Sequence, residues 1–369
     1  MIRQRYAGRV ASIEVSGIRK LFDAGGADAI NLGIGQPDFD TPEHIKDAAV
    51  QAIREGKTGY TPNAGIIELR SALCSKLERE NGLHYTPENI IVTAGGSEAL
   101  HIVLQALVEN GDRVLFPDPG FVSYAALTAV AGGRPDGLPL DANLHIDVEK
   151  AKEMMDGARV LILNSPANPT GAVESEESIR ALVEYGNDHG VTVVSDEVYE
   201  HFIYEKRHFS AARYGEDVVT INAASKTYAM TGWRVGYLAA PEEHVEQCIK
   251  VHQYCQACAT SIAQYAAVAA YTGDQSAIGR MRNEYWVRRN LLYEGLRRIG
   301  FEFPIPEGAF YAFVPMGRSV IEKAIEHGVI IVPGDAFGAN ASHYARISYA
   351  TSRENLSRAL ERLEAIVGD

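Results

Sequence analysis

The stretch Val218-Val-Thr-Ile-Asn-Ala-Ala-Ser-Lys226-Thr-Tyr-Ala-Met-Thr-Gly-Trp-Arg234-Val-Gly236 holds one lysine in an almost uncharged run of residues. The apolar segment from Val218 to Ile221 predicts a buried strand, and Lys226 follows shortly after its end. Most lysines are solvated surface groups, but a lysine among small uncharged residues is expected to be desolvated. Desolvation lowers the pKa of an amine, and a partly neutral amine can act as a nucleophile and as a base.

Two neighbours of Lys226 suit a phosphate group. Arg234 supplies a fixed positive charge, and Ser225 supplies a short hydroxyl donor. A lysine beside a phosphate site is what pyridoxal 5′-phosphate needs, because that cofactor binds its enzyme through a lysine. We therefore take pyridoxal 5′-phosphate as the cofactor hypothesis.

Length and composition limit the classes of protein that the chain can represent. With 369 residues it can form two domains, and 46% hydrophobic and 22% charged residues are typical of a soluble protein. The net charge of −13 disfavours nucleic acid and anionic membranes as partners. The sequence contains no apolar run of membrane-spanning length, and its first residues lack the apolar core of a signal peptide. We expect a cytosolic protein.

The cysteines offer one competing motif, His252-x-x-Cys255-x-x-Cys258, which resembles half of a zinc site. A second ligand pair does not follow it in the sequence, and its surroundings predict a helix. Idle or buried thiols are the simpler interpretation, so we predict no bound metal.

From residue 89 onward short apolar segments alternate with amphipathic ones, which predicts a mainly parallel sheet covered by helices on both faces. The expected strands are 90–93, 114–116, 160–163, 191–194 and 218–221. In such sheets ligands bind beyond the carboxyl ends of the strands. Five candidate residues follow strands and are expected on that edge: Gly96, Phe121, Asn168, Asp196 and Lys226.

Helix signals complete the outline. We expect helices over 13–24, 65–81 and 276–299. Three further helices have start signals. One begins at Thr41-Pro42, with Thr41 as cap and Pro42 in the first turn; one is capped by Ser175 and ends near His189; and one begins at the capping box Thr351-x-x-Glu354. Segments 308–313, 329–332 and 344–348 predict strands of a small α+β domain.

Each candidate site residue also has a purely structural interpretation. Asp196 can pair with the protonated ring nitrogen of the cofactor, or else form a structural salt bridge or helix cap. Asn168 and Tyr199 can bond the phenolic oxygen of the cofactor, although Asn168 also suits a simple turn. Arg346 invites a substrate carboxylate, and the alternative is an ion pair with a distant acid. Phe121 can stack on the cofactor ring or serve as core.

The same is true of the turn Gly95-Gly96-Ser97, which precedes a helix expected over 98–108. Gly96 and Ser97 open that helix, where free backbone N–H groups can hold an anion. Taken alone, such a turn is weak support for a phosphate site.

Taken together, five motifs resemble those of class I pyridoxal-phosphate aminotransferases of fold type I, in the prokaryotic and archaeal aspartate/aromatic branch. The resemblance spans nearly the whole chain, and the motifs are Asn31-Leu-Gly-Ile-Gly-Gln-Pro-Asp38, Asn168-Pro-Thr-Gly171, Asp196-Glu-Val-Tyr199, Ser225-Lys226 with Gly232-Trp-Arg-Val-Gly236, and Arg346-Ile-Ser-Tyr-Ala-Thr-Ser352. It implies an arm with the first part of the small domain over 1–40, a large cofactor-binding domain with a seven-stranded sheet over 41–280, and a small C-terminal domain over 281–369.

The resemblance also implies roles. Lys226 would carry the cofactor as an internal aldimine and move the substrate α-proton, with Asp196 and Tyr199 as its catalytic partners. Gly96, Ser97, Ser225 and Arg234 would hold the phosphate, Phe121 would stack on the ring, and Asn168 would bond the phenolic oxygen. Arg346, Asn168 and the backbone of Gly35 would take the substrate carboxylate. Tyr60 would reach the phosphate of the neighbouring subunit, which makes the active unit a homodimer.

Two positions depart from the family pattern. Ala223 stands where many relatives have a phosphate-binding serine, and Phe121 replaces a tryptophan or tyrosine. An arginine for a second substrate carboxylate is not recognisable either. The expected reaction is amino transfer between an L-amino acid, aspartate first and aromatic next, and a 2-oxo acid such as 2-oxoglutarate. The alternative is a carbon–sulfur β-lyase of the same fold. A regulator of this fold would carry a DNA-binding domain ahead of the first motif, which only about thirty residues precede.

Overall fold

A seven-stranded sheet forms the centre of the larger part of the chain. The computed structural model describes residues 6–13 and 28–368. The strand order is β2-β8-β7-β6-β5-β3-β4; six strands are parallel, and β8 runs antiparallel between β2 and β7. The strands are β2 (Ile90–Thr93), β3 (Arg113–Asp118), β4 (Arg134–Pro139), β5 (Val160–Asn164), β6 (Thr192–Asp196), β7 (Val218–Ala223) and β8 (Gly236–Ala239). The mainly parallel seven-stranded sheet is confirmed.

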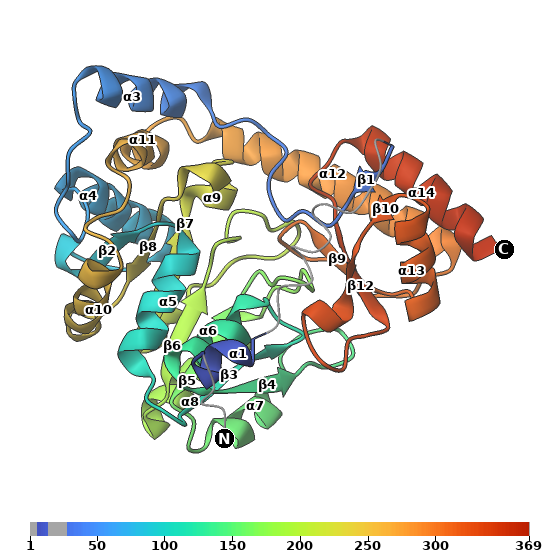
Figure 1. Cartoon of the computed structure of the whole chain (residues 1–369), viewed down its shortest axis with the longest axis horizontal. Helices are drawn as coiled ribbons and strands as arrows, with labels where there is room; N and C mark the ends of the chain where they lie inside the picture. The colour runs from blue at the N-terminus through green and yellow to red at the C-terminus, as the bar shows by residue number, and fades with distance from the viewer. Residues whose placement is uncertain (1–5, 14–27, 369) are drawn as a thin grey trace.

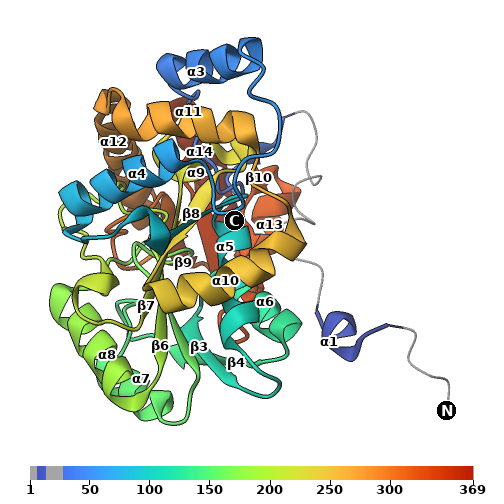
Figure 2. The ribbon, with the colours of Figure 1, turned by 90° about the vertical axis from the view of Figure 1, so that its left-hand side faces the viewer.

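Helices cover both faces of this sheet, because its central strands are apolar on both sides. One face packs against α5 (Gly96–Leu107), α6 (Ser123–Ala131) and α10 (Glu242–Cys255). The other face packs against α7 (Val148–Met155) and α8 (Glu176–His189) at one end, and against α4 (Ile67–Lys76) and α11 (Ser261–Thr272) at the β2–β8 end. Figure 2 shows α7 and α8 on one side of the sheet and α5, α6 and α10 on the other. Helix α3 (Glu43–Arg54) lies outside α11.

The smaller part is built on two further sheets. Strands β11 (Val332–Pro333), β12 (Tyr344–Ser348) and β9 (Tyr311–Pro315) form an antiparallel sheet, and β1 (Ile30–Asn31) pairs in parallel with β10 (Val329–Ile330). Helices α13 (Arg318–Glu326) and α14 (Arg353–Gly368) accompany them. Helix α12 (Ser276–Ile299) extends from the larger part to the smaller one in Figure 1. The predicted domain limits at residues 40 and 280 stay a prediction.

The remaining elements are short. Helix α1 (Gly8–Ala11) has no buried residue and lies at the periphery of the molecule, next to α6. Helix α9 (Ala224–Thr227) follows β7 and carries Lys226. A π-helical turn, η1 (Leu77–Asn81), continues α4, and 3-10 turns occur at Pro87–Asn89, Ala211–Arg213, Thr231–Trp233 and Gly334–Ala336. The helix expected over 13–24 falls almost wholly outside the described residues.

Several helix limits are as expected and two caps are wrong. The limits of α12 match the expected 276–299, and the hydroxyl of Ser175 caps α8 by accepting from the Ser178 N–H. At α3 the cap position is Pro42, and the Thr41 hydroxyl instead donates to the Ala229 carbonyl at 2.8 Å. At α14 it is the Ser352 hydroxyl, not that of Thr351, that accepts from the Asn355 N–H.

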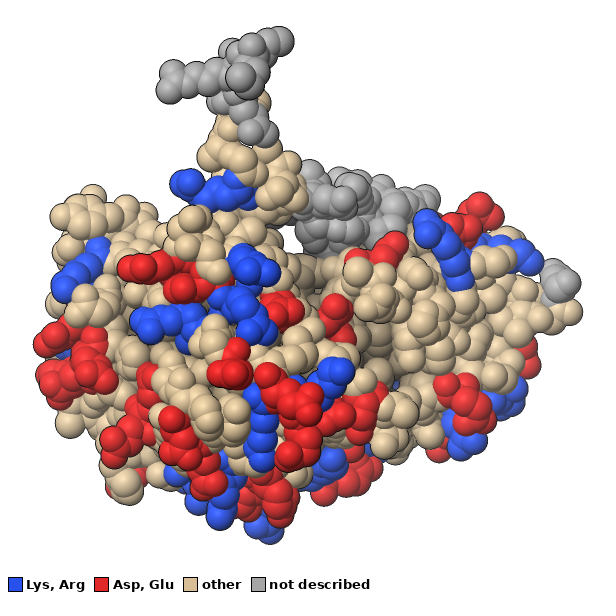
Figure 3. Space-filling view, turned by 90° about the horizontal axis from the view of Figure 1, so that it is seen from below, with Lys and Arg blue, Asp and Glu red and all other residues tan. Residues whose placement is uncertain are grey.

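Two features would point to a membrane or nucleic-acid partner: an apolar spanning helix among the described residues and a patch of one charge on the face drawn in Figure 3. In the described part of the chain, no helix combines the length and the apolar character that crossing a bilayer needs. On the face drawn in Figure 3, acidic and basic side chains are intermixed, so that face carries no extended field of one sign.

Candidate active site

A cavity of about 320 Å³ lies where the carboxyl ends of the parallel strands meet the small sheet. All the predicted site residues except Tyr60 line it: Gly35, Gly96, Ser97, Phe121, Asn168, Asp196, Tyr199, Ser225, Lys226, Arg234 and Arg346. They come from segments more than 300 residues apart in sequence. The doubly wound sheet therefore brings them to one edge, as the motifs predict.

One end of the cavity is a cradle for an anion. Helix α5 begins at Gly96, and the N–H groups of Gly96 and Ser97 have no acceptor among the described residues. Gly95, with φ of 84°, allows Arg234 to lie close, since a Cβ on Gly95 would be 2.5 Å from Arg234 Nη2. Arg234 donates to the carbonyls of Ala94 at 2.8 Å and Thr231 at 2.9 Å. Its guanidinium is thus fixed beside the helix terminus.

Lys226 faces the middle of the cavity from α9. Its Nζ donates to the Gly35 carbonyl at 2.6 Å, across 191 residues of sequence. Burial and the positive charge of Arg346 together lower the pKa of Lys226 to about 8, and Asp196 opposes the shift. The lowered pKa that the uncharged sequence predicts is therefore present.

Asp196 ends β6 with its carboxylate in the cavity wall. Burial raises its pKa to about 6, although a hydrogen bond from the Tyr124 hydroxyl to Oδ2 at 2.9 Å favours the ionised form. The Asn164 side-chain amide holds the Asp196 carbonyl at 3.0 Å. The alternative of a structural salt bridge is not realised, because no Lys, Arg or His pairs with Asp196 among the described residues. Tyr124 and Asn164 were missed by sequence reasoning.

Tyr199 belongs to a polar pair that the sequence did not predict. Its hydroxyl lies 2.8 Å from that of Tyr311, which β9 contributes from the small sheet. Burial raises the pKa of Tyr199 well above its usual value. Tyr311 also comes so close to Gly35 that a Cβ there would be 2.4 Å from its hydroxyl oxygen. A strand residue among apolar neighbours is usually core, so nothing in its segment marked Tyr311 as a site residue.

Arg346 is buried and only partly paired. It is 2% exposed; Nη1 donates to Asn168 Oδ1 at 3.1 Å, Nη2 donates to the Gly33 carbonyl at 2.5 Å, and Nε has no partner within the described residues. The predicted alternative, an ion pair with a distant acid, does not occur in this part of the chain. Burial lowers its pKa. A buried guanidinium with free donor capacity on a cavity suits an incoming carboxylate.

Two predicted residues lie differently from the others. Phe121 contacts Tyr124 edge-on, with ring centroids 5.6 Å apart, and leaves a face on the cavity wall. Tyr60 is 89% exposed and does not line the cavity. In this single chain Tyr60 is therefore apart from the other phosphate-type groups.

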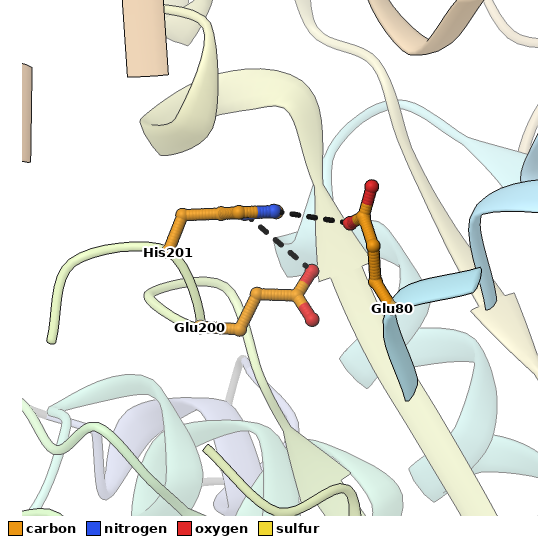
Figure 4. Close-up of side chains that lie close together, drawn as sticks. All are labelled: Glu80, Glu200 and His201. Atoms are coloured by element: carbon orange, nitrogen blue, oxygen red, sulfur yellow. Dashed lines mark hydrogen bonds and ion pairs between the residues drawn. The ribbon is translucent and has the colours of Figure 1, made fainter. Parts of the chain in front are cut away.

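A partly buried charge cluster lies beside Thr227, whose hydroxyl is 3.1 Å from Nδ1 of His201. Figure 4 shows His201 between Glu80 and Glu200, with its Nε2 3.1 Å from Glu80 and its Nδ1 3.7 Å from Glu200. These three residues, and likewise Glu197, Glu200 and His208, are close enough to hold a metal ion. The Lys76 ammonium is hydrogen-bonded to Glu200, however, and so already supplies the positive charge there. Burial would raise the pKa of Glu200, but Lys76, His201 and His208 outweigh it and lower that pKa.

The cysteine motif does not form a ligand set in the described residues. His252 turns to the Asn63 carbonyl at 3.0 Å and to Glu98, while Cys255 is exposed and Cys258 Sγ accepts from the Thr61 N–H. All four thiols are free.

The fold and this site can be compared with known proteins. Residues 27–363 match the family model described as aminotransferase class I and II. The chain therefore belongs to the class I and II aminotransferase family and is an aminotransferase of fold type I.

Relatives agree over almost the full length. The chain is 46% identical to the probable aspartate aminotransferase of Methanocaldococcus jannaschii, covering 98% of this chain and 99% of that one. It is 40% identical to aromatic-amino-acid aminotransferase 2 of Thermococcus litoralis, covering 97% of each. The solved structure of the Thermus thermophilus aspartate aminotransferase with maleate superposes with a TM-score of 0.94 at 38% identity, over 99% of this chain and 100% of that one.

Proposed function

We propose that this aminotransferase uses pyridoxal 5′-phosphate to transfer the amino group between an L-amino acid, aspartate first and aromatic amino acids next, and a 2-oxo acid such as 2-oxoglutarate. The observation that carries the proposal is the cavity itself. It combines a lysine with a lowered pKa, a buried carboxylate and an anion cradle within about 320 Å³.

The residues present fit this cofactor at each of its polar groups. The open N–H groups of Gly96 and Ser97, with Ser225 and Arg234, would hold the phosphate. Asp196 would pair with the ring nitrogen. Ala223 offers no hydroxyl, so this cradle has one donor fewer than the family pattern. When bound, the cofactor supplies an electron sink for the bond that breaks at the substrate α-carbon.

The protein side of the reaction consists of charge placement and proton movement. Asp196 would keep the ring nitrogen protonated, and the hydrogen bond from the Tyr124 hydroxyl favours the ionised form of that carboxylate and fixes its position. Asn168 and Tyr199 line the cavity and would bond the phenolic oxygen. Lys226 would take the α-proton and return it to the neighbouring carbon, because an amine with a pKa near 8 can both accept and give a proton near neutral pH.

Arg346 and Gly35 would bind the substrate α-carboxylate. Arg346 Nη1 now donates to Asn168 and its Nε is unpaired in the described structure, so a carboxylate can be accepted without breaking an ion pair. The Gly35 carbonyl is at present the acceptor for Lys226. This contact supports a carboxylate site next to the amine that would transfer the proton.

The order of substrates rests on the relatives. Those reported above are named for aspartate and for aromatic amino acids, and the Thermus structure was solved with maleate, which is a dicarboxylate. Within the described cavity wall the cations are Lys226, Arg234 and Arg346, so a second substrate carboxylate has no further cation there. The β-lyase alternative gains no support from relatives that are named aminotransferases.

We also propose a homodimer in which Tyr60 reaches the phosphate of the partner subunit. Tyr60 and Tyr254 are 89% and 88% exposed, which is unusual for tyrosines anchored on ordered loops and helices. A second copy of the chain would cover such side chains and would supply the phosphate donor that Tyr60 cannot give within its own chain.

A half-reaction survey tests the proposed function. The holoenzyme is mixed with each common L-amino acid in turn, and the loss of the absorbance of lysine-bound cofactor is followed. We expect aspartate to react fastest and aromatic amino acids next. Slow reaction with all of these, or faster release of a thiol and ammonia from a cysteine thioether, would reject transamination in favour of elimination.

A further inference from the structure

A chain of polar contacts connects the phosphate cradle with the loop that carries Tyr60. It begins at Ala94, directly before the cradle. The Ala94 N–H donates to Glu98 Oε2 at 2.5 Å, while the Ala94 carbonyl accepts from Arg234 at 2.8 Å. The backbone N–H and the carbonyl of Ala94 are thereby both hydrogen-bonded, and Glu98 is the acceptor for the N–H.

Glu98 in turn contacts α10. Its Oε2 accepts from the Gln256 amide at 2.5 Å. Its Oε1 lies 3.4 Å from Nδ1 of His252, which is within ion-pair distance, although Nδ1 makes no hydrogen bond within the described residues. The His252 side chain is 0% exposed. The Glu98 side chain is 13% exposed, so helices α5 and α10 meet here through one buried and one partly buried polar side chain.

The other side of His252 reaches the Tyr60 loop. Its Nε2 lies 3.0 Å from the Asn63 carbonyl, to which it must donate. The Asn63 side chain donates back to the carbonyls of Gln256 and Ala257. Asn63 is three residues from Tyr60, so the end of α10 fixes the base of the loop whose tip is 89% exposed.

We propose that Glu98 and His252 are positioning residues that set cofactor affinity at two sites. Through Ala94 they hold the phosphate cradle of their own subunit, and through Asn63 they hold Tyr60 for the site of the partner. The second half rests on the proposed dimeric function. Loss of these contacts should change the affinity for pyridoxal 5′-phosphate, a property that can be measured without a substrate.

The first test measures the dissociation constant of the cofactor from apoenzyme. His252→Phe preserves the ring volume and removes both polar contacts, and it should weaken cofactor binding about tenfold. His252→Gln, whose amide can approach the Nε2 position, should recover part of that loss. Glu98→Gln should weaken binding as well, and the double variant should lose no more than the stronger single one, because both residues act through one path.

The matched control is His244→Phe on the same helix. His244 also pairs with a carboxylate, Asp217, at 2.6 Å, but neither residue lines the cavity. It should lower thermal stability to a similar extent and leave cofactor affinity unchanged. Equal loss of affinity in His244→Phe and His252→Phe would reduce the effect to general destabilisation and overturn the proposal. Unchanged affinity in His252→Phe would do the same.

Mixed dimers separate the two directions. One subunit carries Lys226→Ala, so that borohydride fixes cofactor only at the Lys226 of the other subunit. His252→Phe is placed either in the Lys226 subunit, where it acts through Ala94, or in the Lys226→Ala subunit, where it acts through Tyr60. At a limiting concentration of cofactor, both arrangements should lower the amount of cofactor that borohydride fixes to Lys226.

The outcomes are distinguishable from a failure of the proposed dimer. Tyr60→Phe in the Lys226→Ala subunit is the reference. If it lowers fixed cofactor but His252→Phe in that subunit does not, the connection through Asn63 is wrong. If Tyr60→Phe has no effect there either, the shared site itself is wrong, and the arrangement through Ala94 alone tests the remaining half.

Discussion

Two lysines withdrawn from bulk solvent, Lys76 in α4 and Lys226 in α9, have different partners. Lys76, 1% exposed, is hydrogen-bonded to Glu200 and to Asn81 Oδ1 at 2.7 Å. Lys226 is half-buried at the cavity wall and donates to an uncharged carbonyl. The positive charges of Arg346 and Arg234 help to lower its pKa. Burial alone therefore does not make a nucleophile. The partners differ as well: Lys76 is hydrogen-bonded to a carboxylate, whereas the positive charges of Arg346 and Arg234 add to burial in lowering the pKa of Lys226.

The same contrast is visible in the sequence. Lys76 is followed closely by Glu78, Arg79 and Glu80, which predicts an ion-paired helix face. Lys226 has no charged neighbour within seven residues in either direction. The local charge composition of the sequence therefore differs between the two lysines in the same sense as their contacts.

The largest expected effect is on Lys226→Ala. Removing the amine takes away both the covalent attachment of the cofactor and the proton carrier, so steady-state transamination should fall by at least about 10⁴-fold. The cofactor should still bind through the phosphate cradle, which equilibrium dialysis measures. Residual turnover within about tenfold of wild type would assign the proton transfer to another group.

Asp196→Ala should come next, with kcat reduced roughly 10³-fold, or about 4 kcal/mol in barrier height. Without the carboxylate nothing holds the ring nitrogen protonated, while the fold should survive because the residue has no salt bridge to lose among the described residues. Activity and the thermal midpoint should be measured together. Turnover within about threefold of wild type would make the carboxylate merely structural.

Lys76→Met should sharpen the comparison through stability. It leaves Glu200 as an unpaired buried charge, and the free energy of unfolding should fall by about 3–5 kcal/mol. Adding Glu200→Gln removes that charge and keeps a partner for Asn81 and Asn222, so most of the loss should be recovered. Denaturant titration gives both values. Equal stability of the single and double variants would show that the pair is not coupled.

The smallest effect concerns pH. Only neutral Lys226 can attach the cofactor, so the rate of covalent reconstitution of apoenzyme should rise with pH and level off above about pH 8. Burial is the main cause of the lowered pKa and Arg346 the next, so Arg346→Met should move the midpoint upward, by about one unit. Stopped-flow absorbance across pH 6–10 measures it. A midpoint that stays in place or falls would show that Arg346 does not influence the amine.

The sequence predicted the cavity well because its residues follow strand ends, and parallel strands present their carboxyl ends on one edge. Tyr124 and Tyr311 escaped because their polar role depends on a single hydroxyl contact between distant segments, while their own segments are apolar. Strand β4 (Arg134–Pro139) was missed because it is an edge strand that contains Pro135 and Gly137. These two residue types are typical of loops, so the local pattern favours a loop there. The caps at Thr41 and Thr351 failed because a tertiary acceptor or a neighbouring hydroxyl competed for the position.

The central claim is that Lys226, and not another buried lysine, carries the cofactor. Borohydride reduction of the holoenzyme followed by tryptic mapping tests it directly. A modified Lys226 resists trypsin, so the account predicts the label in an uncleaved peptide from Tyr214 to Arg234. Label in the peptide from Ser71 to Arg79, which contains Lys76, or on any other lysine would contradict it.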